Sequence, residues 1–267
     1  MRKPLFTFAL SFALIQGCAG SASAASQELF QTVPDNASEI VARARDYAAR
    51  YIDGLPNFIC TQTTMHSAAG KKGDRWSNKG TVTAQLVFAG GKEKRTIQAI
   101  NGKPISTGNS RASRERLTTE GEFGMLLANI LGANSMAEIT WKGFERLRER
   151  EVAVIRYSVD QEHSTLRLSR DYYASAFVAY FGEVFADPNT GVVLRITKQL
   201  ADIPPELETE NSRTVIDYDK VVIAGADYFL PSTASVEMTI RSGRLRNEMS
   251  FNGYRKFEAN STITFQP

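Results

Sequence analysis

Residues 236–251 read VEMTIRSGRLRNEMSF, and this segment decides the fold. In each half, one set of alternate positions is mainly apolar and the other polar, the period expected for a β-strand with one buried face. Ser242-Gly243 lies between the halves and predicts a turn. Residues 176–198, AFVAYFGEVFADPNTGVVLRITK, predict a second hairpin with its turn at 187–191. Together these hairpins predict a long antiparallel meander over residues 177–265.

An amphipathic helix is predicted before the first strand. Asn36 and Glu39 have the spacing of a capping box, and Gly54 and Pro56 end the pattern. Its apolar face consists of Ile40, Val41, Ala44, Tyr47, Ala48 and Tyr51. Because these side chains form one stripe, we expect this helix to pack against another element.

A meander of shorter strands is predicted next, over 58–66, 82–88 and 96–100. Gly90-Gly91 turns the chain between the second and third of these strands. Asn101-Gly102 predicts a type I′ turn that leads into 103–107.

A second helix is predicted from Thr119, which forms a capping-box pair with Glu122, to Gly132. Its apolar face consists of Phe123, Leu126, Leu127, Ile130 and Leu131. A face this broad suits a helix that lies on the concave side of a sheet. The segment 108–116 before it has no periodicity and is predicted to be a mobile loop.

Further strands are predicted over 137–141, 152–159, 164–168 and 215–222, with a loop or short helix at 203–207, where two prolines exclude a central strand. The prediction is therefore an α+β fold, mostly β, with a curved antiparallel sheet (a half-barrel) packed over two or three helices. At 267 residues, one domain over 25–267 is sufficient.

The first 24 residues have the features of a secretory signal peptide. Arg2 and Lys3 precede an apolar run, and small residues end in Ala22-Ser23-Ala24. The run is shorter than the roughly 20 residues of a bilayer span. We therefore expect export to the periplasm or the outer membrane, with a mature N-terminus at Ala25. Cys18, after small residues, offers lipidation and hence membrane association as an alternative.

The charge composition gives no reason to expect nucleic-acid binding. The chain has 32 basic and 29 acidic residues, and removal of residues 1–24 takes away two basic residues, which leaves a net charge of +1. The runs at 92–95 and 146–150 mix both signs and are predicted to be solvated surface.

The sequence shows no catalytic or metal-binding motif. His66 and His163 are far apart and lie beside no cysteine at metal-ligand spacing, so neither a metal nor another cofactor is expected. Asp217 and Asp219 share a strand face and Glu120 and Glu122 begin a helix, but solvent-facing acids explain both pairs better than a carboxylate enzyme. Cys60 is predicted to be a small buried side chain.

The densest aromatic cluster comprises Tyr172, Tyr173, Phe177, Tyr180, Phe181 and Phe185. Residues 176–185 are predicted to form one strand, so Phe177, Phe181 and Phe185 share one face and Tyr180 lies on the other. A packed core and the apolar wall of a cavity are both open interpretations.

Three segments carry a resemblance to a known family: FGEVFADPNTGVVLRI (181–196), VIDYDKV (215–221) and YFLP (228–231). With the order of elements, they resemble the strand pairs of the periplasmic lipoprotein-carrier (LolA/LolB/RseB-like) half-barrel superfamily. They also look like exported proteins of soil bacteria. The resemblance implies a half-barrel closed by helices over an apolar cavity that takes acyl chains or peptides without catalysis. The segment 108–116 departs from that pattern, and no lipoprotein-binding signature maps onto this chain.

The main functional hypothesis is therefore a non-enzymatic envelope protein that binds either a hydrophobic ligand or a partner protein of the envelope. The expected hydrophobic ligand is a lipid or the acyl chain of a lipoprotein. The expected cavity wall consists of Phe123, Leu126, Leu127, Ile130, Phe177 and Phe181. The alternatives are a structural or protein-interaction module with a filled core and, with less support, an envelope hydrolase.

Overall fold

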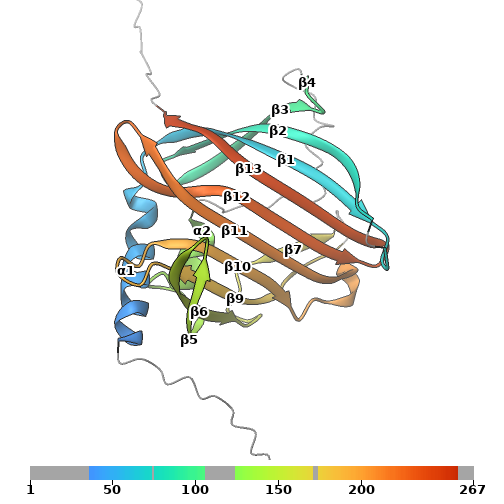
Figure 1. Cartoon of the computed structure of the whole chain (residues 1–267). Helices are drawn as coiled ribbons and strands as arrows, with labels where there is room; N and C mark the ends of the chain where they lie inside the picture. The colour runs from blue at the N-terminus through green and yellow to red at the C-terminus, as the bar shows by residue number, and fades with distance from the viewer. Residues whose placement is uncertain (1–35, 74, 106–123, 171–173, 258–267) are drawn as a thin grey trace, which may run out of the picture. The chain divides into compact units, whose positions relative to one another are not determined.

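The computed structural model describes residues 36–257 apart from 74, 106–123 and 171–173, and these residues belong to one unit, 33–267. Its main element is an eleven-stranded curved sheet in the order β4-β3-β2-β1-β13-β12-β11-β10-β9-β6-β5 (Figure 1). The strands are β1 (Phe58–Ala69), β2 (Ser77–Ala89), β3 (Lys92–Ile100), β4 (Lys103–Pro104), β5 (Glu138–Leu147), β6 (Arg150–Val159), β9 (Ala179–Ala186), β10 (Val193–Ala201), β11 (Thr209–Ile223), β12 (Ala226–Ile240) and β13 (Gly243–Lys256). Neighbouring strands in this sheet are antiparallel, so the predicted fold class is confirmed.

The predicted turns are confirmed by their backbone conformation. Asn101 and Gly102 have φ values of 50° and 73°, as a type I′ turn requires. In the 187–191 turn, Oδ1 of Asp187 accepts hydrogen bonds from the backbone N–H groups of Asn189 and Thr190, both at 2.9 Å. A carboxylate that binds its own backbone two and three residues on fixes this reversal.

Helix α1 (Ala37–Gly54) runs past the ends of several strands (Figure 1). The Arg43 side chain donates a hydrogen bond to the carbonyl oxygen of Pro188 in the β9–β10 turn at 3.0 Å. The Tyr51 hydroxyl donates one to the carbonyl oxygen of Phe229 in β12 at 2.7 Å. The helix prediction is confirmed, but the capping box is not, because the Asn36 side chain makes no cap hydrogen bond in the described structure.

Helix α2 (Met125–Leu131) is the described part of the second predicted helix, and Gly132 ends it as expected. Leu127, Ile130 and Leu131 are buried in the main core together with side chains of α1 and of the sheet. The predicted start at Thr119 and the predicted loop at 108–116 lie outside the described residues.

A separate hairpin, β7 (Arg167–Arg170) with β8 (Ala174–Phe177), lies between β6 and β9 in the sequence. Leu168, Ala174 and Ala176 of this hairpin pack against the main core, as does Leu166 just before it. The 3₁₀ turn η1 (Pro205–Leu207) occupies the predicted break, and Arg170 pairs with Glu208 beside it at 2.9 Å. The predicted single strand 176–185 is wrong, because the chain leaves one sheet at Phe177 and joins the other at Ala179.

Candidate functional site

We call the sheet face that carries α1 and α2 the inner face, and the opposite one the outer face. The inner face is a continuous apolar surface from β2 to β6 in the order of the sheet. Its sheet residues include Phe58 and Cys60 of β1, Leu86 of β2, Tyr157 of β6, Tyr180 and Val184 of β9, Ile216 and Tyr218 of β11, and Met249 and Phe251 of β13. A large concave apolar surface is the feature on which a hydrophobic ligand could lie.

Three of the expected cavity-wall residues lie on α2. Leu127 is 1% exposed and Ile130 is fully buried, both within the main core, and Leu126 packs against that core while partly exposed. Phe123 lies outside the described residues. The α2 residues are therefore where a ligand on the inner face would meet the helix.

Phe177 and Phe181 are corrected by the structure. Their side chains are 51% and 43% exposed, and neither belongs to the main core. Side chains alternate between faces along a strand, and in β9 it is Tyr180 and Val184 that point inward, which turns Phe181 outward. Phe177 lies in the separate β7–β8 hairpin. The inward set that replaces them is Val178, Tyr180, Val184 and Ala186.

The outer face has a small apolar core of its own. Leu147, Val152, Val154, Phe185 and Leu194 form this outer cluster, and Val192 and Phe229 pack against it. The β5–β6 hairpin supplies Leu147 from beside its turn, where Arg148 and Glu149 have φ values of 47° and 66°. Both faces of β9 are consequently buried at its C-terminal end.

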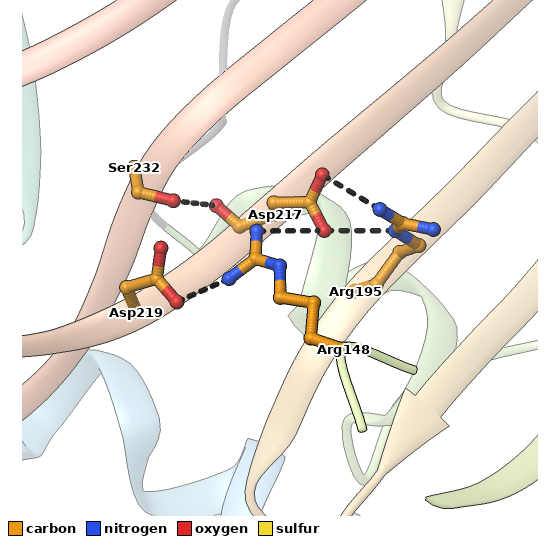
Figure 2. A network of polar contacts seen from close by, with 5 residues as sticks. All are labelled: Arg148, Arg195, Asp217, Asp219 and Ser232. Carbon is orange, nitrogen blue, oxygen red and sulfur yellow. Dashed lines mark hydrogen bonds and ion pairs between the residues drawn. The ribbon is translucent and has the colours of Figure 1, made fainter. Parts of the chain in front are cut away.

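An ion-pair network holds the tip of that hairpin against β11 (Figure 2). Arg195 donates two hydrogen bonds to the carboxylate of Asp217, at 2.8 and 3.0 Å. Arg148 reaches the same carboxylate at 3.3 Å and also pairs with Asp219. Asp217 is only 8% exposed, so the prediction of a solvent-facing acid is wrong for it. Two arginines therefore pair with these two acids, and Arg148 links the hairpin tip to β11.

A groove of about 590 Å³ lies beside this region on the outer face. Side chains from β5, β6, β9, β10 and β11 line it, among them Glu138, Arg156, Phe181, Glu183 and Arg213. Glu183 pairs with Lys142 at 2.7 Å. The lining is mixed in charge and exposes one aromatic ring, so it lacks the apolar character of the inner face.

The inner face carries buried polar side chains among its apolar ones. Gln62, Thr64, Ser212, Thr214 and Asn247 are all buried. Nδ1 of His66 lies 2.8 Å from Oδ1 of Asn247 across the β1–β13 pair. Sequence reasoning missed these residues, because they come from strands far apart in the chain.

Burial also sets the chemistry of the inner-face thiol and phenols. It raises the pKa of the Cys60 thiol to about 12 and holds the pKa of Tyr51 well above its usual range. Cys60 is therefore a buried apolar side chain and Tyr51 a neutral hydrogen-bond donor. Within the described ranges, no cluster of three or more His, Cys, Asp or Glu residues could hold a metal ion.

No protein-family model matches the chain, and no curated protein matches its sequence. Solved structures that resemble it include a LolA superfamily protein of Nitrosomonas europaea, with 8% identity and a TM-score of 0.42 over 84% of this chain and 94% of that one. A DUF1329 family protein of Desulfovibrio piger shows 11% identity and a TM-score of 0.41 over 83% and 95% of the two chains. A putative outer membrane lipoprotein-sorting protein domain of Vibrio parahaemolyticus shows 10% identity and a TM-score of 0.37 over 80% of this chain and 90% of that one.

Of these three structures, the Nitrosomonas europaea protein bears the LolA superfamily name. In the part of the chain that the structure describes, no helix is both long and apolar enough to cross a membrane.

Proposed function

We propose that this protein is a non-enzymatic carrier or receptor of the cell envelope that binds an acyl chain between the inner face and α2. The observation that carries the proposal is the way α2 is held. Its described part has seven residues, its N-cap is Gly124 with a φ of 148°, and no side chain among the described residues caps it. Its first turn contains no acid and its last turn no base.

A helix this short does not form by itself in water, so the apolar contacts of Leu127, Ile130 and Leu131 hold it in place. Such contacts are non-directional, and an acyl chain can replace part of them at little cost. An element held by side-chain packing, without caps or strand pairing, opens at a lower free energy than the strands of the sheet. α2 can therefore shift outward and pack again on a ligand that lies beneath it.

The test is displacement of a fluorescent acyl probe from the mature protein by fatty acids of increasing length. Each buried methylene contributes about 0.8 kcal/mol, which is roughly a fourfold gain in affinity per carbon until the space is filled. Leu127→Glu places a charge in this space and should abolish binding, whereas Met125→Glu, at an exposed position of the same helix, should not. The proposal fails if the probe never binds or if affinity does not depend on chain length.

A second candidate is an interaction module whose concavity is filled by its own helices. The near-complete burial of Leu127, Ile130 and Leu131 favours it, because α2 then occupies the space permanently. Native mass spectrometry of protein purified from cells separates the two candidates, since only a carrier retains a lipid. An envelope hydrolase has less support, because the acids at Asp217 and Asp219 are held in ion pairs.

The location in the envelope is part of the proposal, and it follows from the N-terminal signal pattern at residues 1–24. The signal region, with Cys18, lies outside the described residues. The intact mass of the exported form should correspond to a chain that begins at Ala25 or at a lipidated Cys18. A mass that retains Met1 to Gly17 contradicts the signal assignment.

A further inference from the structure

The inner face changes from apolar to polar along its strands. On β1, Phe58 and Cys60 belong to the main core, and Gln62 and Thr64 follow them on the same face because side chains two residues apart share a face. The same change occurs on β13, from Phe251 and Met249 to Asn247, and on β11, from Tyr218 and Ile216 to Thr214 and Ser212. The apolar half is the half next to α1, because Tyr51 of α1 contacts Tyr218 edge to face.

The strand registers bring the polar positions to neighbouring levels of the sheet. His66 pairs with Asn247, Asn247 with Val236, and Val236 with Thr214. Thr64 lies one inward position before His66 on β1. We call Thr64, His66, Asn247, Ser212 and Thr214 the polar band.

Thr64 is the member of this band that calls for an explanation. Its side chain is 2% exposed, and its hydroxyl has no hydrogen-bond partner among the residues that the structure describes. Its cross-strand neighbours on the two sides are Val82 and Met249, which offer no strong acceptor. A buried hydroxyl left without a partner is costly, and such groups are rare in folded proteins unless something else binds them.

We propose that the polar band binds the polar end of an amphiphile, with the Thr64 hydroxyl donating to a carboxylate or ester oxygen. The acyl chain then runs along the apolar half toward α1. Phe58 and Thr64 are six residues apart, which at about 3.3 Å per residue is roughly 20 Å, the length of a long extended acyl chain. This inference rests on the proposed function and adds to it the orientation of the ligand and an oxygen acceptor at its polar end.

The experiment compares Thr64→Val with Thr63→Val, the same substitution on the neighbouring residue, whose side chain points to the outer face. Thr64→Val removes the hydroxyl and keeps the shape. It should raise the unfolding temperature of the ligand-free protein and weaken binding of dodecanoic acid or methyl dodecanoate by about 2- to 10-fold, the value of one net hydrogen bond. Binding of a hydrocarbon probe of equal length should not change. Thr64→Ser, which keeps the hydroxyl, should retain the affinity for both oxygen-bearing ligands.

The outcomes separate this inference from the proposed function. If the wild-type protein binds no member of the series, the proposed function fails. If it binds with chain-length dependence, but Thr64→Val and Thr63→Val have equal affinities, the polar band does not contact the ligand and the inference is overturned. The comparison of acid with methyl ester shows whether the acceptor is a carboxylate or a carbonyl oxygen. A loss of binding confined to the acid identifies the carboxylate.

Discussion

The burial of α2 can be tested by two substitutions on the same helix. Leu127 is 1% exposed within the main core, and Met125, two residues earlier, is 62% exposed. Truncation of a buried leucine to alanine costs about 2–5 kcal/mol, because apolar contacts are lost and a cavity remains. Truncation at an exposed site costs about 0.5 kcal/mol or less. Both changes replace a good helix former by alanine, so intrinsic helix propensity contributes similarly to each.

Urea denaturation of the mature protein measures the difference. Leu127→Ala should lower the midpoint and leave the slope of free energy against urea unchanged, because the surface exposed on unfolding is nearly the same. In a thermal scan the same loss should lower the midpoint by about 2–4 °C for each kcal/mol. Equal midpoints for Leu127→Ala and Met125→Ala would refute the position of α2 on the inner face, and with it the basis of the proposed function.

Three further predictions follow from other contacts. Arg148→Ala should destabilise the protein by about 1–2 kcal/mol, because Asp217 then keeps only one of its two arginines. The control Arg146→Ala removes an exposed ion pair with Glu149 and should cost under about 1 kcal/mol. Equal unfolding midpoints for the two variants would contradict the ion-pair network. Gly182→Ala should cost about 3 kcal/mol or lower the yield of folded protein, because a Cβ there overlaps the carbonyl oxygen of Thr197; a near-wild-type midpoint would exclude this approach. Cys60 should resist iodoacetamide at pH 8 in the folded protein and react in denaturant. The reason is that burial raises the pKa of this thiol to about 12, and the thiolate is the form that reacts. Labelling of the folded protein would contradict the burial of Cys60.

Local patterns were sufficient for most of the fold. The Asn101-Gly102 turn and the apolar stripe from Ile40 to Tyr51 depend on interactions within a few residues, and the structure contains both. The break at 203–207 followed from proline, which cannot donate to a strand ladder. These features depend on dihedral angles and local periodicity, which the sequence contains directly.

The face of a strand is harder to predict when both faces are apolar. In 179–186, Tyr180 and Val184 form one set, and Phe181 and Phe185 form the other. Alternation separates the two sets but does not say which one faces the helices. Phe185 is buried in the outer cluster, so the outer set also has a core to join. In the structure, Tyr157 lies opposite Gly182 and its hydroxyl donates to the carbonyl oxygen of Thr197 at 2.7 Å, so the even-numbered positions of β9 face inward, and only the pairing of β6 with β9 reveals this.

The charge run at 146–150 shows that the local sequence also does not predict which charged side chains form long-range ion pairs. Mixed charges along a segment usually mean a solvated surface, and Arg146 with Glu149 fits that expectation. Arg148 does not, because a β-turn with positive φ directs the hairpin tip over the outer cluster toward β11. The partner acids lie about seventy residues further along the chain, with a sequence separation of 71 for Asp219. Only the fold brings them within reach.

The polar band could not be predicted from the sequence, because it depends on how β1 and β13 are aligned when they pair. His66 and Asn247 are separated by 181 residues and meet because the first long strand of the meander pairs with the last. A shift of one residue in that pairing would turn Asn247 to the outer face and leave His66 beside an arginine or a glutamate. The band therefore depends on the β1–β13 register, which the buried pairs at the apolar end of the same strands stabilise. Phe58 stacks on Phe88 at 5.2 Å and meets Tyr254 edge to face at 5.5 Å, and these contacts fix the level at which Thr64 faces its neighbours. The residues that would hold the acyl chain thus also position the residues that would hold its polar end.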